Sequence, residues 1–239
     1  MTRRAIVLFT GDPRREEMQK SLPPRFLSAL HGELIETIRR TPDVSLVIAS
    51  ESSGRFHLAY GDRQASVVSD RLGEKIDCAY RFAFELGFDS VVLLAGDVAG
   101  VELDVIDRAF ATLEGTDERS VLGPSRDGGF YLLGLNRAAA SRAAIDWNSI
   151  PWFTASPSEA LASVVRALGW QLSFVRQIDD IDSFSDAVRV TGNLSLQFAK
   201  LRSRLHSLLS DRSFAFDSLD LVPPAHLFEI ALLRAPPLF

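Results

Sequence analysis

The sequence has few cysteines and histidines and no excess of positive charge. Cys78 is its single cysteine, so the chain cannot form an internal disulfide, which is typical of a reducing compartment. The four histidines are scattered and give no zinc-type spacing with Cys78. The formal net charge of −5 at pH 7 argues against nucleic-acid binding through bulk electrostatics. These absences exclude a disulfide scaffold and predict no nucleic-acid partner.

Membrane and secretion signals are also missing. No apolar run approaches the ~20 residues that a membrane-spanning helix needs. The early apolar run at 5–9 ends at Thr10-Gly11-Asp12-Pro13, so a signal peptide is not expected. The chain also lacks a Walker loop and the strings Gly-x-Gly-x-x-Gly and Gly-x-Ser-x-Gly. We therefore expect a cytoplasmic protein with no membrane partner.

The pattern that is present alternates short apolar runs with amphipathic segments. Hydrophobic residues make up 46% of the chain and charged residues 24%, the profile of a globular protein. The apolar runs predict strands at 5–9, 44–49, 89–96, 121–122, 130–133 and 172–175. Steps of three and four predict helices at 26–38, 72–86, 103–113 and 156–169, and the polar stretch 51–69 is interpreted mainly as loop. This alternation predicts an α/β fold, with a mostly parallel sheet covered by helices on both faces.

Local signals mark some helix ends. Pro23 and Pro24 suit the first turn of the helix at 26–38, and glycines at 87 and 169 suit helix ends. Ser156 and Glu159 have the spacing of a capping box, with Pro157 at the first helical position.

The pattern changes after residue 182 to a helix and an apolar tail. Apolar residues recur at helical steps, and the segment from 211 onward is rich in Phe and Leu. We divide the chain into a domain at 1–190 and a C-terminal helix plus apolar tail at 191–239. The tail packs either on its own domain or on a partner subunit, and the second alternative implies a homodimer.

Carboxylates follow two of the predicted strands. Asp97 comes directly after the most apolar strand, and Asp180 and Asp182 follow the last one. Ligands in open α/β sheets bind beyond the carboxyl ends of the strands, where Mg²⁺ takes one or two carboxylates plus phosphates. The alternative is structural: Asp97 caps the following helix, and the acidic run 179–182 ends by capping the helix near residue 183.

Two loops are further candidates. The segment 123–129 holds Asp127, Gly128 and Gly129 and is either a simple hairpin turn or a loop that binds a sugar or base. The loop Thr10-Gly11-Asp12-Pro13-Arg14-Arg15, followed by Lys20 and Arg25, either holds a diphosphate or carries solvated arginines. Cys78 lies in an apolar helical pattern and is interpreted as a core residue.

Several strings together resemble a known bacterial family. These are VVLLAGD at 91–97, LGPSRDGGFYLLG at 122–134, DRLGEKI at 70–76, IDW at 145–147 and DIDS at 180–183. They resemble GT-A-fold glycosyltransferase-like proteins described as nucleotide-diphospho-sugar transferases or arsenosugar-biosynthesis glycosyltransferases. That family is related to the phospholactate and molybdenum-cofactor guanylyltransferases, and the resemblance covers roughly residues 4 to 190.

The resemblance implies a Rossmann-like GT-A fold and a divalent metal, Mg²⁺ or Mn²⁺, beneath a nucleotide ligand. It implies metal binding by Asp97, Asp182 and Asp180, and catalytic roles for Asp97 and Asp127. The residues expected at the nucleotide are Thr10, Gly11, Arg14, Arg15, Gly73 and Gly96. The residues expected at the substrate are Asp127, Gly128, Gly129, Tyr131 and Trp147.

The chain departs from the family pattern at two places. The family's first loop is usually Lys-x-Pro-x-Pro-Gly followed by Lys-Thr-Arg-Leu, where this chain has 10–15, and Ala99 replaces a usual proline. Three hypotheses result. The first is a metal-dependent transferase that uses a nucleotide-diphosphate sugar, and the second is a nucleotidyltransferase acting on a phosphorylated acceptor. The third is a catalytically silent nucleotide-binding or scaffold protein.

Overall fold

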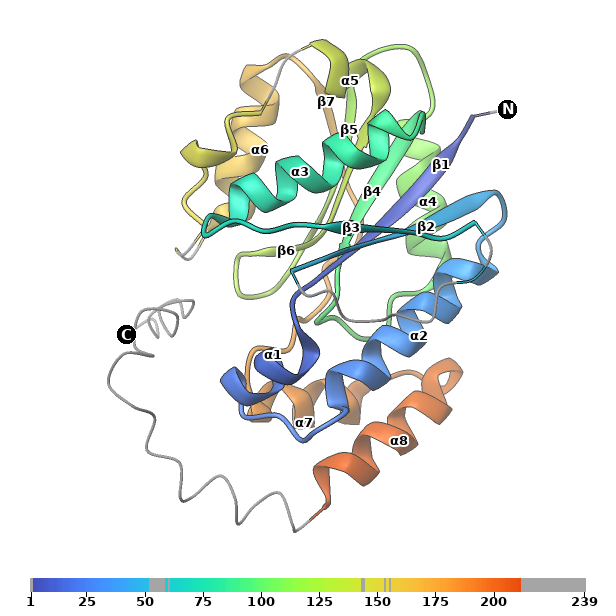
Figure 1. The fold of residues 1–239 in the computed structure, drawn as a ribbon, viewed down its shortest axis with the longest axis vertical. Helices are drawn as coiled ribbons and strands as arrows, with labels where there is room; N and C mark the ends of the chain where they lie inside the picture. The colour runs from blue at the N-terminus through green and yellow to red at the C-terminus, as the bar shows by residue number, and fades with distance from the viewer. Residues whose placement is uncertain are drawn as a thin grey trace.

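A seven-stranded sheet forms the centre of the molecule (Figure 1). The computed structural model describes residues 2–51, 59, 61–142, 145–152, 154 and 156–211. The strands are β1 (Arg4–Thr10), β2 (Val44–Ser50), β3 (Arg63–Ser66), β4 (Ser90–Ala95), β5 (Arg119–Pro124), β6 (Phe130–Asn136) and β7 (Gln171–Phe174). Their order is β3-β2-β1-β4-β6-β5-β7, and β6 is antiparallel to both of its neighbours while the other pairs are parallel. The predicted mostly parallel sheet is confirmed.

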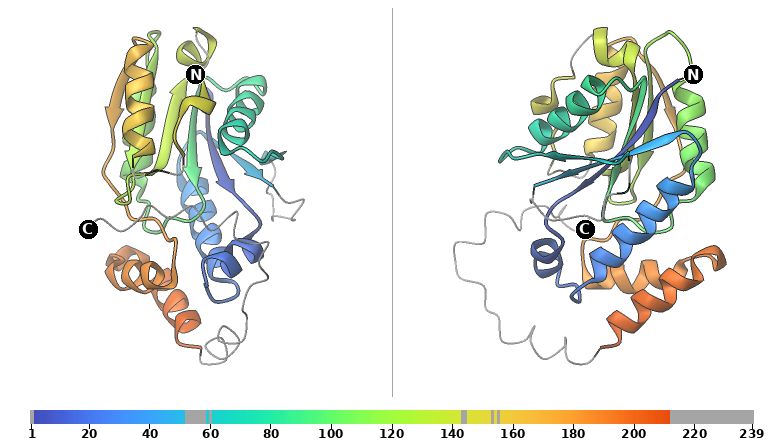
Figure 2. Two further views of the ribbon diagram at one scale, coloured as in Figure 1. Left: turned by 90° about the vertical axis from the view of Figure 1, so that its left-hand side faces the viewer. Right: turned by 45° about the vertical axis from the view of Figure 1, so that its right-hand side comes forward.

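Helices cover both faces of this sheet (Figures 1 and 2). They are α1 (Pro13–Gln19), α2 (Phe26–Arg40), α3 (Leu72–Glu85), α4 (Leu103–Leu113), α5 (Arg137–Arg142), η1 (Trp147–Ser149), α6 (Pro157–Ala167), α7 (Phe184–Asn193), η2 (Leu196–Phe198) and α8 (Ala199–Leu209). One core lies between the sheet and α3, α5 and α6, and a second lies between the sheet and α2 and α4. Because both faces are covered, the central strands β1 and β4 are buried along most of their length.

A third core lies beyond the end of the sheet. It joins α2, α7 and α8, and its buried members include Leu194, Phe198, Leu201 and Leu205. These residues follow the apolar pattern that predicted one continuous helix. In the structure Leu194 is the C-cap of α7, Phe198 lies in η2, and Leu201 and Leu205 lie in α8. The tail from 212 onward lies outside the described residues, so its packing and the division at residue 190 stay predictions. Within the described part of the chain, no helix is both long and apolar enough to cross a membrane.

Four local predictions are corrected. The polar stretch 51–69 contains β3, which pairs with β2. The first loop is short because α1 begins at Pro13. The helix after Pro23 and Pro24 begins at Phe26, and its N-cap Arg25 has a φ of 70°. Ser156 is the N-cap of α6 but makes no side-chain capping hydrogen bond, although Pro157 does start that helix.

Glu17 supplies the missing cap of α2. Its buried carboxylate accepts hydrogen bonds from the backbone N–H of Arg25 at 3.0 Å and of Leu27 at 2.9 Å. These amides would otherwise lack partners at the start of the helix. The side chain of Glu17 therefore fixes α1 against the first turn of α2.

Candidate functional site

The acidic residues converge at the carboxyl ends of β4 and β5. Asp97 follows β4, and Asp127 lies in the loop after β5. The segment 178–182 runs across both strand ends, since Asp180 forms a bridge with Val98 and Ile178 forms one with Ser125. The backbone N–H of Ile181 also donates to the carbonyl of Asp97 at 3.0 Å. This crossing brings the two acidic segments of the sequence to one edge of the sheet.

Three of the carboxylates lie close together. Asp127, Asp180 and Asp182 each offer one oxygen atom, and these atoms all lie within 4.8 Å of one another. Their surroundings raise the pKa of Asp180 to about 8. Burial is the largest cause, followed by the charges of Asp97, Asp182 and Asp127. Burial is also the largest cause of the raised pKa of Asp182, where Lys20 partly opposes it. Both shifts therefore combine burial with repulsion between neighbouring carboxylates.

Asp127 is held by its own loop. Its Oδ1 accepts hydrogen bonds from Ser125 Oγ at 2.7 Å and from the backbone N–H of Gly129 at 2.8 Å. Gly128 has a φ of 95°, in the left-handed region that favours glycine, and its carbonyl accepts from Ser158 N at 3.1 Å. Because β5 and β6 are antiparallel neighbours, the loop is a hairpin connection that also borders the acidic cluster.

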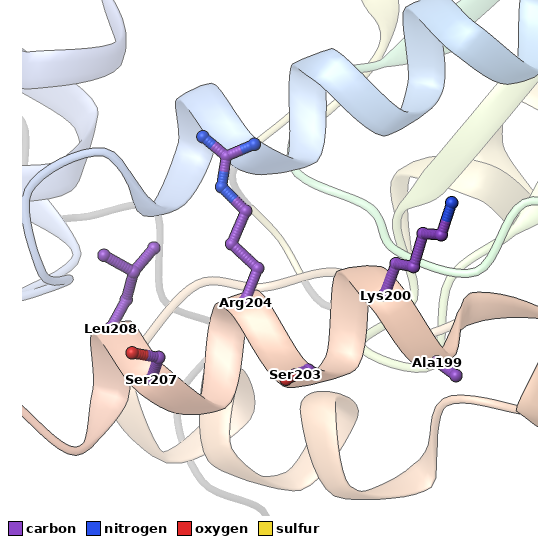
Figure 3. A pocket seen from close by; sticks show the side chains of 6 residues that line it. All are labelled: Ala199, Lys200, Ser203, Arg204, Ser207 and Leu208. Atoms are coloured by element: carbon purple, nitrogen blue, oxygen red, sulfur yellow. The ribbon is translucent and has the colours of Figure 1, made fainter.

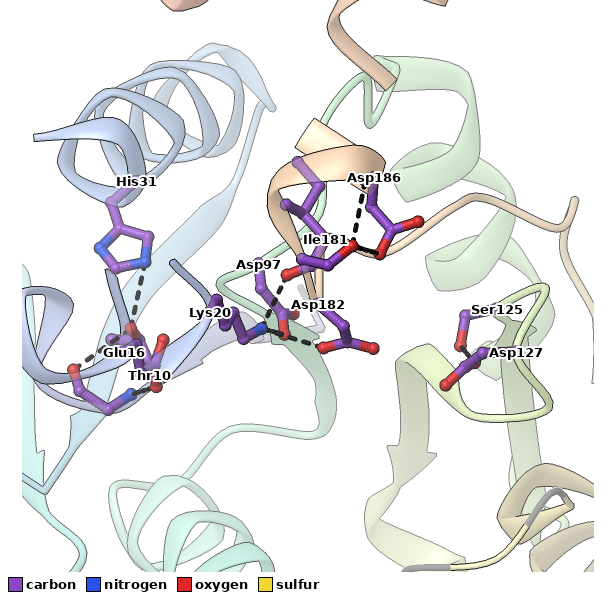
Figure 4. A network of polar contacts seen from close by, with 12 residues as sticks. Thr10, Glu16, Lys20, His31, Asp97, Ser125, Asp127, Ile181, Asp182 and Asp186 are labelled. Atoms are coloured by element: carbon purple, nitrogen blue, oxygen red, sulfur yellow. Dashed lines mark hydrogen bonds and ion pairs between the residues drawn. The ribbon is translucent and has the colours of Figure 1, made fainter. Parts of the chain in front are cut away.

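Lys20 links three parts of this edge (Figure 4). Its Nζ donates to Asp97 Oδ2 at 2.7 Å and to the carbonyl of Ile181 at 2.8 Å, and it lies 3.1 Å from Asp182 Oδ1. Although burial opposes it, the ammonium holds the pKa of Asp97 below its ordinary value. Burial lowers the pKa of the Lys20 ammonium, but the carboxylates of Asp97 and Asp182 outweigh this effect and raise it above its ordinary value.

Neither Asp97 nor Asp182 is the N-cap of the helix that follows it. The N-cap of α4 is Glu102, so Asp97 does not cap that helix. The N-cap of α7 is Ser183, whose hydroxyl accepts from the backbone N–H of Asp186. Neither Asp97 nor Asp182 is therefore needed as a helix cap, and both side chains are directed to the shared edge with Lys20.

The first loop is tied down by its own carboxylates. Asp12 Oδ1 accepts from the backbone N–H groups of Arg14 and Arg15, each at 3.0 Å, and Glu16 Oε1 accepts from Gly11 N at 2.8 Å. Burial, followed by the charge of Asp97, raises the pKa of Glu16 to about 7. The two arginines are exposed. Their contact with a phosphate stays a prediction.

Thr10 and Gly96 pack with a buried histidine beneath this edge. Thr10 Oγ1 lies 3.1 Å from His31 Nε2. A Cβ atom at Gly96 would lie 2.8 Å from the same nitrogen, so the close approach of these three residues requires glycine there. Burial lowers the pKa of His31 to about 4, with Asp97 opposing it, so the imidazole is neutral at pH 7.

The remaining predicted residues lie in the two cores. Gly73 packs against Trp147, since a Cβ at position 73 would lie 2.7 Å from the Trp147 carbonyl oxygen. Trp147 stacks between Tyr80 and Trp152. Tyr131 is 1% exposed, and its hydroxyl donates to the Arg176 carbonyl at 2.8 Å. Each has a packing role in this structure, and contact of these residues with a ligand stays a prediction.

Sequence reasoning did not find the part played by Lys20, Glu16 and His31. Lys20 was considered only as a phosphate contact, and its partners are 77 and 161 residues away in the chain. No local pattern indicates such contacts.

Elsewhere, a hollow of about 630 Å³ lies along α8 (Figure 3) and is lined by Ala199, Lys200, Ser203, Arg204, Ser207 and Leu208. None of the predicted site residues lines it.

Comparisons with known proteins agree with this fold. Residues 34–152 match the family model described as "Uncharacterized protein conserved in bacteria (DUF2064)". A candidate nucleotide-diphospho-sugar transferase from Desulfovibrio desulfuricans G20 superposes with a TM-score of 0.72 at 19% identity, covering 90% of this chain and 99% of that one. A search of the curated proteins finds no match.

Two more distant structures share the fold. The mannosyltransferase PcManGT from Pyrobaculum calidifontis, in complex with GDP-Man and Mn²⁺, has a TM-score of 0.52 at 13% identity and covers 95% of this chain and 78% of that one. A 4-diphosphocytidyl-2C-methyl-D-erythritol synthase has a TM-score of 0.51 at 14% identity, covering 79% of this chain and 97% of that one.

The sheet order and the acidic edge define a GT-A-like protein with the fold of nucleotide-diphospho-sugar transferases. This fold agrees with the family that the motifs resemble, and residues 34–152 match the DUF2064 model.

Proposed function

We propose that this protein is a divalent-metal-dependent transferase that uses a nucleotide-diphosphate sugar as donor. The observation that carries the proposal is the cluster of Asp127, Asp180 and Asp182, whose ligand oxygens lie within 4.8 Å of one another. The cluster lies at the carboxyl edge of a GT-A-like sheet, which is where α/β proteins bind ligands.

The donor set fits Mg²⁺ or Mn²⁺. Both prefer carboxylate oxygens, and no nitrogen or sulfur ligand is needed. Burial is the largest cause of the raised pKa of Asp180, and the charges of neighbouring carboxylates add to it; a bound cation would offset that repulsion. The mannosyltransferase PcManGT, which shares the fold, is described in complex with GDP-Man and Mn²⁺. In our proposal Asp127, Asp180 and Asp182 hold the cation, and Asp97 lies beside them in an ion pair with Lys20.

Each residue at the edge has a separate task in this mechanism. A divalent cation there supplies positive charge that stabilises the departing nucleoside diphosphate. Lys20 keeps the segment 178–182 against the end of β4 and so fixes the spacing of the carboxylates. Asp127 is oriented through Oδ1 by Ser125 and Gly129, and its exposed carboxylate can accept a hydrogen bond from an acceptor hydroxyl.

A nucleotidyltransferase is the second candidate. The likeness to a 4-diphosphocytidyl-2C-methyl-D-erythritol synthase favours it, since the same sheet serves that class. Such an enzyme would bind an intact nucleoside triphosphate and release pyrophosphate. The third hypothesis, a catalytically silent protein, is motivated by the first loop, whose amides are held by Asp12 and Glu16.

The experiment compares ligands by thermal shift and isothermal titration calorimetry. Nucleotide-diphosphate sugars and nucleoside triphosphates are added with Mg²⁺ or Mn²⁺, since a ligand at 100 times its Kd stabilises the fold by about 2.7 kcal/mol. Asp180→Asn should lower Mn²⁺ affinity at least about tenfold. Asp104→Asn is the matched control, because Asp104 is an exposed carboxylate on α4. Equal Mn²⁺ binding by both variants refutes the metal site, and no stabilisation by any nucleotide supports the silent protein.

A further inference from the structure

We propose that Glu16 limits the affinity of this site for a diphosphate, because its carboxylate occupies the backbone amide that the first loop presents to an incoming phosphate. The inference rests on the proposed function, since it concerns the ligand of the same edge. Glu16 corresponds to no residue that the sequence motifs single out.

The Gly11 amide lies at the same edge as Asp97. Gly11 follows β1 and Asp97 follows β4, and these strands are neighbours in the sheet. The backbone N–H of Gly96 donates to the Phe9 carbonyl at 2.9 Å, so the two strand ends stay paired up to this edge. A phosphate beside Asp97 would therefore meet the first loop at Gly11.

Glu16 fills the space above Gly11. Its Oε1 accepts the Gly11 N–H at 2.8 Å, and a Cβ atom at position 11 would lie only 2.2 Å from that oxygen. The absence of a side chain at Gly11 is thus needed for the carboxylate of Glu16. The half-buried position of Glu16 on the first turn of α1 holds the contact in place.

A carboxylate and a phosphate compete for the same donor. One N–H makes one good hydrogen bond, so a phosphate oxygen takes it only after Glu16 Oε1 has left. Above its pKa of about 7 Glu16 is also an anion, like the phosphate, and two like charges a few ångströms apart repel each other in a partly buried site. Asp12 already holds the amides of Arg14 and Arg15, so they do not offer a replacement. The contact of Glu16 therefore opposes diphosphate binding.

The test measures pyrophosphate binding to three full-length variants by calorimetry, with Mg²⁺ present and at a pH above the pKa of Glu16. Glu16→Ala frees the amide and removes the charge, and Glu16→Gln removes the charge while keeping the size of the side chain. Glu36→Gln on α2 is the control, because Glu36 is exposed and the change in net charge is the same. We expect Glu16→Ala to bind pyrophosphate about tenfold more tightly than the wild type, equivalent to about 1.4 kcal/mol. Glu16→Gln should gain less and Glu36→Gln nothing.

A second readout locates the effect. In ¹⁵N-labelled protein, the Gly11 amide resonance should move on addition of pyrophosphate to Glu16→Ala and should move little in the control at equal occupancy. Pyrophosphate affinities of both Glu16 variants equal to the control overturn this inference while leaving the proposed function intact. If neither the wild type nor any variant binds pyrophosphate or a nucleotide with metal present, both proposals fail.

Discussion

Lys20 is the positive charge on which the geometry of the acidic edge depends, and its removal gives a direct test. Lys20→Met keeps the length of the side chain and removes the ammonium that contacts Asp97, Asp182 and the Ile181 carbonyl. Asp97 then remains partly buried without its cation. We expect the variant to be destabilised at pH 7, with the segment 178–182 less firmly held.

The magnitude follows from the burial of the pair. Removing one partner of a buried ion pair costs about 3–5 kcal/mol, whereas an exposed pair contributes about 0–1 kcal/mol. The side chains of Lys20 and Asp97 are 17% and 26% exposed, so this pair is closer to the buried class, while Asp182 at 50% adds little. We expect a loss of about 3 kcal/mol, which corresponds to a fall in Tm of about 6–12 °C for a chain of this size.

The assay is urea and thermal unfolding of four proteins: wild type, Lys20→Met, Asp97→Asn and the double variant. Asp97→Asn should recover most of the loss in the Lys20→Met background, because the neutral amide no longer needs a cation. A loss below about 1 kcal/mol for Lys20→Met, the range of an exposed pair, contradicts the reasoning. So does an effect of Asp97→Asn that is the same in both backgrounds.

Two further predictions concern buried residues, His31 beneath the acidic edge and Gly73 on α3. His31 has a pKa of about 4 in the folded state against 6.5 when unfolded, so the unfolded chain binds its proton first and stability falls by up to about 3 kcal/mol as the pH drops from 6.5 to 4. The raised pKa of Glu16 has the opposite effect, because it stabilises the fold as the pH falls. The measurement therefore compares the free energy of urea unfolding of His31→Gln with that of the wild type between pH 6.5 and 4. The same dependence on pH in both proteins would contradict the prediction for His31. Gly73→Ala should cost about 1–3 kcal/mol because its Cβ would meet the Trp147 backbone, whereas Gly32→Ala, with open space around it, should be neutral or stabilising in the same thermal scans.

The sheet could be predicted because its central strands are buried on both faces. A strand such as β4 has no polar alternation, and its apolar run and flanking polar residues define it in the sequence. The edge strand β3 gives no such signal, since Ala65 is its one buried residue. The helix α1 was missed for another reason. Its sequence is polar, and the capping pair Asp12-Pro13 that starts it was interpreted as part of a loop.

The site could be predicted only in part. Asp97 and Asp180 were candidates because they follow strands, and topology alone brings strand ends to one edge. The partner of Asp97 could not be predicted from the sequence. Lys20 reaches Asp97 because α1 is packed against the start of α2 through Glu17, and that packing is a tertiary contact. Periodicity in the sequence describes which face of a helix is buried, and it carries no information on which distant carboxylate a lysine at the end of a short helix will reach.

The charges at the edge, taken together, favour a cation over a free anion. Asp97, Asp127, Asp180 and Asp182 converge there, with Lys20 as the one ammonium that contacts them among the described residues. Burial is the largest cause of the raised pKa values of Asp180 and Asp182, and the charge of Asp97 adds to both. Above its pKa of about 7, Glu16 adds negative charge in the first loop, on the amide that a phosphate would use in our proposal. A diphosphate therefore meets repulsion unless a divalent cation enters with it or before it. In our proposal, the departure of the first loop from the family pattern makes binding of the nucleotide depend more strongly on the metal.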